Sequence, residues 1–269
     1  MQNILSAILL ISACLLTGCS RQGSERDITA IEQNDSLPDI VKSVVRAVAE
    51  DDSTGFASLV SYPLHRPYPL RDISDAAEMS RYYHTLVDDS LRRVITGSRP
   101  EEWSEYGWRG WSVDDGSYLW LDSLIYDIPY LSRRETAELA KARALDLESL
   151  PADLRADWIP VAALKADNGT LLRIDSRQSA DAAPAMRLLV YNKGTDPRGK
   201  PSRIIPGSAE PDGSMGNPVY VFNDTDNSIW TYLPWSADST TPYFSVENSD
   251  GSISELNVSP VNWIEAIQK

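Results

Sequence analysis

Residues 158–176 read WIPVAALKADNGTLLRIDS, and this stretch has the pattern of a β-hairpin. Two runs rich in apolar residues, 158–166 and 170–176, flank the turn sequence Asp167-Asn168-Gly169. Asn and Gly favour the tight turns that join antiparallel strands, because both tolerate positive φ angles. We therefore expect two paired antiparallel strands here, followed by a further strand over 186–192.

Similar strand-and-turn patterns occur on both sides of this hairpin. Upstream, residues 108–113 and 118–125 flank the turn sequence Asp114-Asp115-Gly116-Ser117. Downstream, residues 197–217 are rich in Gly, Pro and Ser, which predicts a long loop or linker. Beyond that loop we expect short strands and a final helical turn, over 219–223, 229–233, 243–247, 252–258 and 261–268.

Three segments have the apolar spacing of amphipathic helices, and they are residues 36–50, 75–96 and 132–147. The second and third segments each begin with the spacing of a capping box. The residues that form these boxes are Asp75 with Glu78, and Ser132 with Glu135. Long helices followed by antiparallel hairpins predict the α+β fold class.

The region 37–192 resembles the cystatin-like cone of nuclear-transport-factor-two-like domains, in its order of helix, kink, helix and hairpins. In those domains, N-terminal helices pack across a strongly curved antiparallel sheet. The resemblance implies a cone-like α+β domain, which we place over residues 37–196. The short strands expected after the loop predict a small all-β antiparallel region over 218–269. The helix expected over 132–147 is an insertion relative to the simplest version of that pattern.

The first two dozen residues have the pattern of a secretory signal. Residues 1–18 contain no charged side chain, and the apolar run 4–16, ILSAILLISACLL, is too short to span a bilayer. The run ends in Leu16-Thr17-Gly18-Cys19, which resembles the lipobox of bacterial lipoproteins. That resemblance implies cleavage before Cys19 and acylation of its thiol and new amino group. Several acyl chains would anchor the protein stably to a lipid bilayer.

These features together predict five segments: a signal peptide (1–18), a lipidated polar tether (19–36), the cone-like domain (37–196), the linker or loop (197–217) and a β-rich C-terminal region (218–269). The expected location is the cell envelope, with attachment to lipid through Cys19. Residue 20 is Ser rather than an acidic residue, and in the lipoprotein family this favours the outer membrane.

The composition excludes several classes of function. The chain of 269 residues has 25 Lys and Arg against 39 Asp and Glu, a formal net charge of −14. A nucleic-acid footprint needs clustered basic residues, so we expect no nucleic acid as a partner. With 2 His and 2 Cys, the chain lacks the ligands for a Cys/His zinc framework, and we expect no metal. The sequence has no phosphate-binding P-loop and no Gly-x-Ser-x-Gly nucleophile motif, and we expect no cofactor.

A cluster of aromatic and charged residues on and just before the hairpin predicted over 108–125 is the candidate ligand-binding site. Its members are Trp103, Trp108, Arg109, Trp111, Tyr118, Trp120 and Asp122. Flat aromatic rings combined with a carboxylate and a guanidinium suit the recognition of a sugar or a peptide. The alternative is structural, because large aromatic residues also fill the concave core of a curved sheet.

Two further features leave a functional and a structural interpretation open. Residues 204–268 contain nine acidic residues and no Lys or Arg. Eight aromatic residues lie in the same stretch: Tyr220, Phe222, Trp230, Tyr232, Trp235, Tyr243, Phe244 and Trp263. This region suits either a cation-dependent or carbohydrate-binding module, or a soluble acidic β region. The histidines, His65 and His84, also have two interpretations. Each is an ordinary surface or core residue, or it is a general base that Asp72, Asp88 or Asp122 orients.

The sequence therefore predicts a membrane-anchored envelope lipoprotein that acts as a non-catalytic module for binding a ligand or a protein. Its candidate partners are an envelope protein or a glycan. One alternative is an enzyme that uses a cone-type pocket for acid–base chemistry on a small substrate. This alternative requires a histidine and a carboxylate to meet in a concavity. Another alternative is an assembly component of an outer-membrane complex.

Overall fold

The structure is a computed structural model that describes residues 28–177, 185–212, 217–234 and 242–268. The chain divides into two compact units. Unit 1 comprises Met1–Ser61 and Met79–Tyr130, and unit 2 comprises Tyr62–Glu78 and Leu131–Lys269. The expected signal peptide (1–18) and Cys19 lie outside the described residues.

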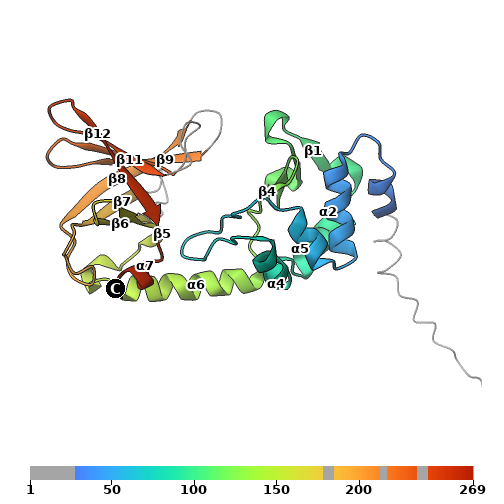
Figure 1. Cartoon of the computed structure of the whole chain (residues 1–269), viewed down its shortest axis with the longest axis horizontal. Coiled ribbons are helices and arrows are strands. Elements are labelled where there is room, and N and C mark those ends of the chain that lie inside the picture. Colours follow the sequence, from blue (N-terminus) through green and yellow to red (C-terminus); the bar gives the residue numbers. More distant parts are fainter. Residues whose placement is uncertain (1–27, 178–184, 213–216, 235–241, 269) are drawn as a thin grey trace, which may run out of the picture. The chain divides into compact units, whose positions relative to one another are not determined.

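Unit 1 combines helices with a small antiparallel sheet (Figure 1). Its helices are α2 (Asp39–Ala49), α3 (Ser53–Ser58), part of α4 (Ala76–Leu86) and α5 (Asp89–Gly97), with 3-10 turns at Pro100–Glu102, Gly107–Arg109 and Asp114–Gly116. The sheet has the order β1 (Trp103–Glu105), β2 (Trp111–Val113), β3 (Trp120–Leu121) and β4 (Ile125–Asp127). The helix expected over 36–50 is confirmed as α2, whose valine stripe is buried.

Two expectations in unit 1 need correction. The prediction of a single helix over 75–96 is wrong, because α4 ends at Leu86 and a separate helix, α5, begins at Asp89. Asp88 is extended at this break, and its carboxylate accepts hydrogen bonds from the backbone N–H groups of Ser90 (2.9 Å) and Leu91 (3.1 Å). Asp88 is therefore the N-cap of a new helix. The strand predicted from residue 108 begins at Trp111, because Gly107–Arg109 forms a 3-10 turn.

Unit 2 is built around a closed antiparallel barrel. Its strands are β5 (Ile159–Ala166), β6 (Leu171–Arg177), β7 (Ala185–Tyr191), β8 (Arg203–Asp212), β9 (Asn217–Asn223), β10 (Ile229–Leu233), β11 (Tyr243–Glu247) and β12 (Ile253–Pro260). Neighbours along the chain pair with each other, and β12 pairs with β5 to close the barrel. The hairpin predicted over 158–176 is confirmed as β5 and β6, and the α+β class is confirmed.

Side chains alternate between the inside of the barrel and a second core outside it. The inward cluster is apolar and includes Leu164, Ile174, Leu188, Phe222, Tyr232, Phe244 and Val258. The outward cluster consists of Leu150, Leu154, Ala163, Leu189, Tyr191 and Trp263. The C-terminal end of helix α6 (Arg133–Glu148), the 3-10 turn Ala152–Leu154 and the short helix α7 (Trp263–Ala266) cover this outer face (Figure 1).

The division of the chain differs from the segments expected from its sequence. The barrel joins strands from the region 37–196 to strands from 218–269, and β8 occupies about half of the stretch 197–217 that was expected to be a linker or loop. Within the expected tether (19–36), residues 28–32 are helical and Ile31 is fully buried. Local patterns predict single hairpins, whereas closure of a barrel depends on pairing between strands far apart in the chain.

Candidate functional site

Three of the aromatic residues predicted to bind ligand pack within unit 1. Trp103 is buried, and its indole N–H donates to Ser98 Oγ at 2.9 Å. The ring of Tyr118 stacks on Tyr130, with 5.4 Å between centroids. Trp120 packs edge-to-face on a neighbouring tyrosine and lies over Gly116, where a Cβ atom would come within 2.2 Å of the indole. These contacts agree with the structural alternative for this part of the cluster.

The other members of the cluster are more accessible. Trp108 is 67% exposed, and the guanidinium of Arg109 lies 5.3 Å from the centroid of its ring. Trp111 is half-buried and Asp122 is exposed. The structure thus brings Trp108 and Arg109 together, whereas Trp103, Tyr118 and Trp120 make their ring contacts or hydrogen bonds with residues outside the predicted set. Ligand binding by this cluster stays a prediction.

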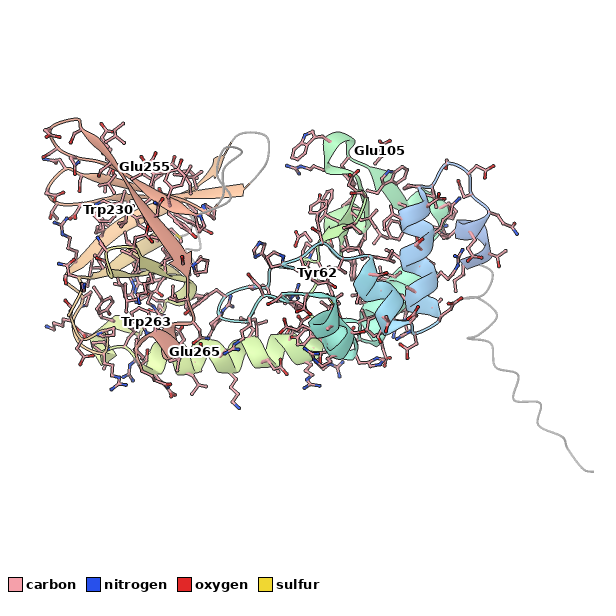
Figure 2. All side chains as sticks on the ribbon, viewed as in Figure 1. Tyr62, Glu105, Trp230, Glu255, Trp263 and Glu265 are labelled. Atoms are coloured by element: carbon pink, nitrogen blue, oxygen red, sulfur yellow. The ribbon has the colours of Figure 1, made fainter. Side chains whose placement is uncertain are left out.

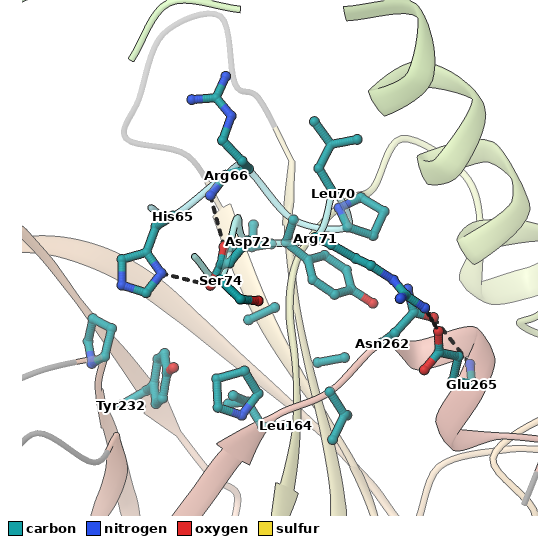
Figure 3. A pocket seen from close by; sticks show the side chains of 18 of the residues that line it. His65, Arg66, Leu70, Arg71, Asp72, Ser74, Leu164, Tyr232, Asn262 and Glu265 are labelled. Atoms are coloured by element: carbon teal, nitrogen blue, oxygen red, sulfur yellow. Dashed lines mark hydrogen bonds and ion pairs between the residues drawn. The ribbon is translucent and has the colours of Figure 1, made fainter. Parts of the chain in front are cut away.

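A cavity of about 750 Å³ lies at one end of the barrel, and the sequence did not indicate it. We call it the mouth cavity. It is formed by barrel strands, by residues at the start of α7, and by the segment Tyr62–Glu78, which we call the covering segment. Its lining includes charged, aromatic and aliphatic side chains: His65, Arg71, Asp72, Glu78, Val161, Leu164, Tyr220, Tyr232 and Glu265. Figure 3 shows the covering segment on one side and Leu164 and Tyr232 on the strand side.

The barrel side of the cavity is aromatic and aliphatic. Tyr220 and Tyr232 are neighbours on β9 and β10, and their rings stack with 6.0 Å between centroids. Phe244 lies 5.0 Å from Tyr232 and 6.0 Å from Trp230, centroid to centroid. These rings fill much of the barrel interior, as side chains commonly do in barrels of eight strands. The mouth cavity therefore ends on the tyrosines and does not continue as an open channel through them.

The two tyrosine hydroxyls have no hydrogen-bond partner among the described residues. Tyr232 is only 5% exposed, and burial raises the pKa of its phenol far above the usual value. Burial also raises the pKa of Tyr220. Both groups are therefore neutral near pH 7, and each offers one donor and one acceptor. Both residues line the cavity, so these hydroxyls are candidates for contact with a ligand or water.

The covering segment places a histidine–carboxylate pair at the edge of the cavity (Figure 3). His65 Nδ1 lies 2.8 Å from Asp72 Oδ2, and the backbone N–H of Arg66 donates to Asp72 Oδ1 at 2.9 Å. Burial alone would raise the pKa of Asp72, but these hydrogen bonds outweigh it and hold the pKa below its ordinary value. The pairing arises because the segment folds back on itself through a bridge between Leu64 and Ile73.

The side chains of Arg66, Tyr68 and Arg71 fasten the covering segment to the rest of unit 2. The guanidinium of Arg66 lies 2.9 Å from Glu135 Oε1 at the start of α6, and both side chains are almost fully buried. The hydroxyl of Tyr68 donates to Asp146 Oδ2 at 2.6 Å, and burial together with this carboxylate raises the pKa of Tyr68 well above its usual range. Arg71 pairs with Glu265 on α7.

Asp146 also belongs to a buried ionic cluster on the outer face of the barrel. Arg173 on β6 pairs with Asp146, and its Nε donates to Asp175 Oδ1 at 2.7 Å. Arg187 on β7 donates to Asp175 Oδ2 at 2.7 Å, and its guanidinium lies 4.2 Å from the ring centroid of Trp158. Paired, hydrogen-bonded charges of this kind are tolerated in a core, whereas a single unmatched charge is strongly destabilising.

The second histidine is in a different environment. His84 belongs to unit 1, is exposed, and has Nδ1 3.8 Å from Asp51 Oδ1. Of the proposed orienting carboxylates, Asp88 caps α5 and accepts from Tyr130, and Asp122 is exposed. The sequence did not place either histidine beside a particular carboxylate. In the structure His65 forms a short contact with Asp72 at the edge of the mouth cavity.

Within residues 28–177, 185–212, 217–234 and 242–268, no helix is both long enough and apolar enough to cross a membrane. No group of three or more His, Cys, Asp or Glu side chains in the same residues is placed to hold a metal ion.

Comparison of the chain with protein-family models, curated proteins and solved structures gives no match. The mouth cavity is therefore interpreted from its own geometry and chemistry.

Proposed function

We propose that this protein is a non-catalytic binding module that holds a small organic ligand in the mouth cavity. The observation that supports this proposal is a cavity of about 750 Å³ with aliphatic and aromatic walls and a few polar groups at its edge. Small-molecule sites in proteins commonly have this volume and this mixture of groups. The tyrosine hydroxyls and the pair of His65 and Asp72 would orient the ligand.

The proposal includes attachment to the cell envelope. The lipobox-like sequence before Cys19 supports acylation at that residue, and the absence of an acidic residue at position 20 supports an outer-membrane location. The exposed Trp108, with Arg109 beside it, would be available to a glycan or an envelope protein. Cone-like packing of helices on a curved sheet is proposed for unit 1 alone, where α2, α3 and α5 share a unit with the small sheet.

A cavity-filling variant tests the binding proposal. Ala162 lines the cavity on β5, so Ala162→Phe places a ring in the space that a ligand would occupy. A library of small organic compounds would be screened by thermal shift against the wild type. The matched control is Ile253→Phe, because Ile253 is 69% exposed on β12. We expect compounds that stabilise the wild type and Ile253→Phe but not Ala162→Phe. Compounds that stabilise all three proteins equally would show that the cavity is not the site.

The contact between His65 and Asp72 favours a second candidate, an enzyme that uses His65 as a general base. The distance of 2.8 Å is short enough for Asp72 to orient the imidazole. Each stabilising compound would be incubated with the protein and then analysed by mass spectrometry. A binding module returns the compound unchanged. Conversion that is lost in His65→Gln would establish the enzyme and overturn the non-catalytic proposal.

A further inference from the structure

The charged groups that line the mouth cavity are unequally matched. Three carboxylates line it, from Asp72, Glu78 and Glu265. Asp72 is paired with His65, and Glu265 is paired with Arg71. Glu78 Oε2 accepts a hydrogen bond from the backbone N–H of Ser74 at 2.8 Å, and the described residues supply it with no cationic partner.

The third basic residue of the lining does not offset this imbalance. The guanidinium of Arg66 is committed to Glu135, which does not line the cavity, and the Arg66 side chain is only 1% exposed. Figure 3 shows this side chain directed away from Tyr232 and Leu164. The cavity therefore has a surplus of negative charge, which attracts cations and repels anions over short distances.

A second and independent observation lies on the barrel side. The hydroxyl of Tyr232 is without a partner among the described residues, and its side chain is more than nine-tenths buried at the cavity wall. A neutral phenol oxygen accepts a hydrogen bond from an ammonium N–H. Tyrosine rings also attract a cation through their negative faces. The tyrosine pair thus favours the same sign of ligand charge as the carboxylates.

We propose that the mouth cavity selects an organic cation that carries one compact apolar group, such as an arylalkyl ammonium ion. This inference rests on the proposed binding function and adds the charge and size of the ligand. The apolar group would contact Val161 and Leu164, while the ammonium group lies within reach of Tyr232 and the carboxylates. Long acyl chains are disfavoured, because Phe244 and Trp230 occupy the barrel beyond the tyrosines.

Three matched probes test the inference: benzylamine, benzyl alcohol and benzoate. They share one ring and differ in charge at pH 7, being cationic, neutral and anionic. Binding to the full chain would be measured by isothermal titration calorimetry at low ionic strength. We expect benzylamine to bind about 10-fold more tightly than benzyl alcohol, because a charged group adds a stronger hydrogen bond. We expect benzoate to bind more weakly than either.

Variants identify the groups responsible. Glu78→Gln should weaken benzylamine about 10-fold and leave benzyl alcohol unchanged, since it removes charge but little volume. Tyr232→Phe should weaken both probes that donate a hydrogen bond. The matched control is Glu255→Gln, because Glu255 is exposed on β12 and does not line the cavity (Figure 2). It should change neither affinity.

The outcomes separate this inference from the binding proposal. If benzyl alcohol or benzoate binds as tightly as benzylamine, and Ala162→Phe abolishes that binding, the charge preference is wrong and the binding function stands. If Glu255→Gln lowers the benzylamine affinity as much as Glu78→Gln does, the attraction is a general effect of the acidic surface, and the inference is overturned. If benzylamine does not bind at millimolar concentration, the inference is overturned, and the library screen decides the binding proposal.

Discussion

Substitution of Glu135 by Ala should strongly destabilise unit 2. The guanidinium of Arg66 lies 2.9 Å from Glu135 Oε1, and the two side chains are 1% and 0% exposed. The second carboxylate oxygen accepts from the backbone N–H of Ser132 at 3.1 Å and completes the capping box of α6. Glu135→Ala therefore removes the carboxylate that compensates a buried cation, which typically costs about 3–5 kcal/mol. Loss of the capping contact adds about 1 kcal/mol.

Two comparisons make this expectation specific. In the first, Glu138→Ala removes an exposed carboxylate one turn along the same helix, where it pairs with Arg134 at 2.9 Å. An exposed pair of this kind contributes about 0.3–0.5 kcal/mol. In the second, the double variant Arg66→Met with Glu135→Leu removes both buried charges and keeps similar volumes. We expect the double variant to be more stable than Glu135→Ala by about 2 kcal/mol or more.

Urea denaturation followed by circular dichroism measures these differences. The free energy of unfolding comes from the midpoint and the m-value, which should stay unchanged if the native state keeps its compactness. The reasoning is refuted if Glu135→Ala loses no more stability than Glu138→Ala. It is also refuted if the double variant loses as much free energy of unfolding as the sum of the losses of Arg66→Met and Glu135→Leu made singly. The two charges would then be uncoupled.

Three further expectations concern other parts of the chain, and a fourth concerns its attachment. Asp175→Asn should lower the free energy of unfolding by about 3 kcal/mol, since two buried guanidiniums share that carboxylate; a thermal melt equal to wild type would contradict it. The lowered pKa of Asp72 means that its ionised form stabilises the fold above about pH 4, and this contribution is lost as the pH falls through the folded pKa. Asp72→Asn should therefore be less stable than wild type at pH 7, by a difference that shrinks as the pH falls below about 4, and equal urea midpoints at pH 7 would count against this. Trp108→Ala should change stability by less than about 0.5 kcal/mol, and a larger loss would reveal unrecognised packing. Cys19→Ala should abolish incorporation of labelled palmitate, and persistent labelling would refute the lipobox assignment.

Local elements of the fold were predictable because short-range chemistry determines them. The capping box of Ser132 and Glu135 opens α6, and the Asp167-Asn168-Gly169 turn joins β5 to β6. Closure of the barrel was not predictable, because β12 and β5 are far apart in the chain and pair only at Pro260, Ser259 and Val258. That pairing depends on the twist and stagger of all the strands between them.

Strand β8 shows why composition was misleading in the stretch 197–217. Gly and Pro residues there suggested a loop. A Cβ atom on Gly207 would lie 2.3 Å from the carbonyl oxygen of Val221 and 2.4 Å from the ring of Phe222. Glycine at this position permits close approach of β8 to β9 and does not mark a turn. Glycine therefore occurs both in loops and in tightly packed strands, and composition alone does not distinguish the two.

The candidate site was predictable only in pieces. His65 and Asp72 were among the possible pairs, but the sequence does not show that the Leu64–Ile73 bridge brings them together. Tyr220 and Tyr232 belong to the aromatic set of the acidic region, and their spacing from Phe222 and Trp230 has the period of a strand. That period indicates a shared face but not which other segment completes the wall.

The way in which the covering segment is fastened links ligand binding to stability. Arg66 and Tyr68 bind carboxylates of α6, and Arg71 binds Glu265 on α7. Helix α7 also carries the buried Trp263 (Figure 2). A ligand in the mouth cavity contacts both the segment and the barrel, so it binds the docked arrangement and not the unfolded chain. At 100 times its dissociation constant, such a ligand adds about 2.7 kcal/mol to the free energy of unfolding. That gain is comparable to the loss expected on breaking the Arg66–Glu135 pair. A saturating ligand should therefore restore much of the stability that Glu135→Ala removes, provided that the covering segment forms part of its site.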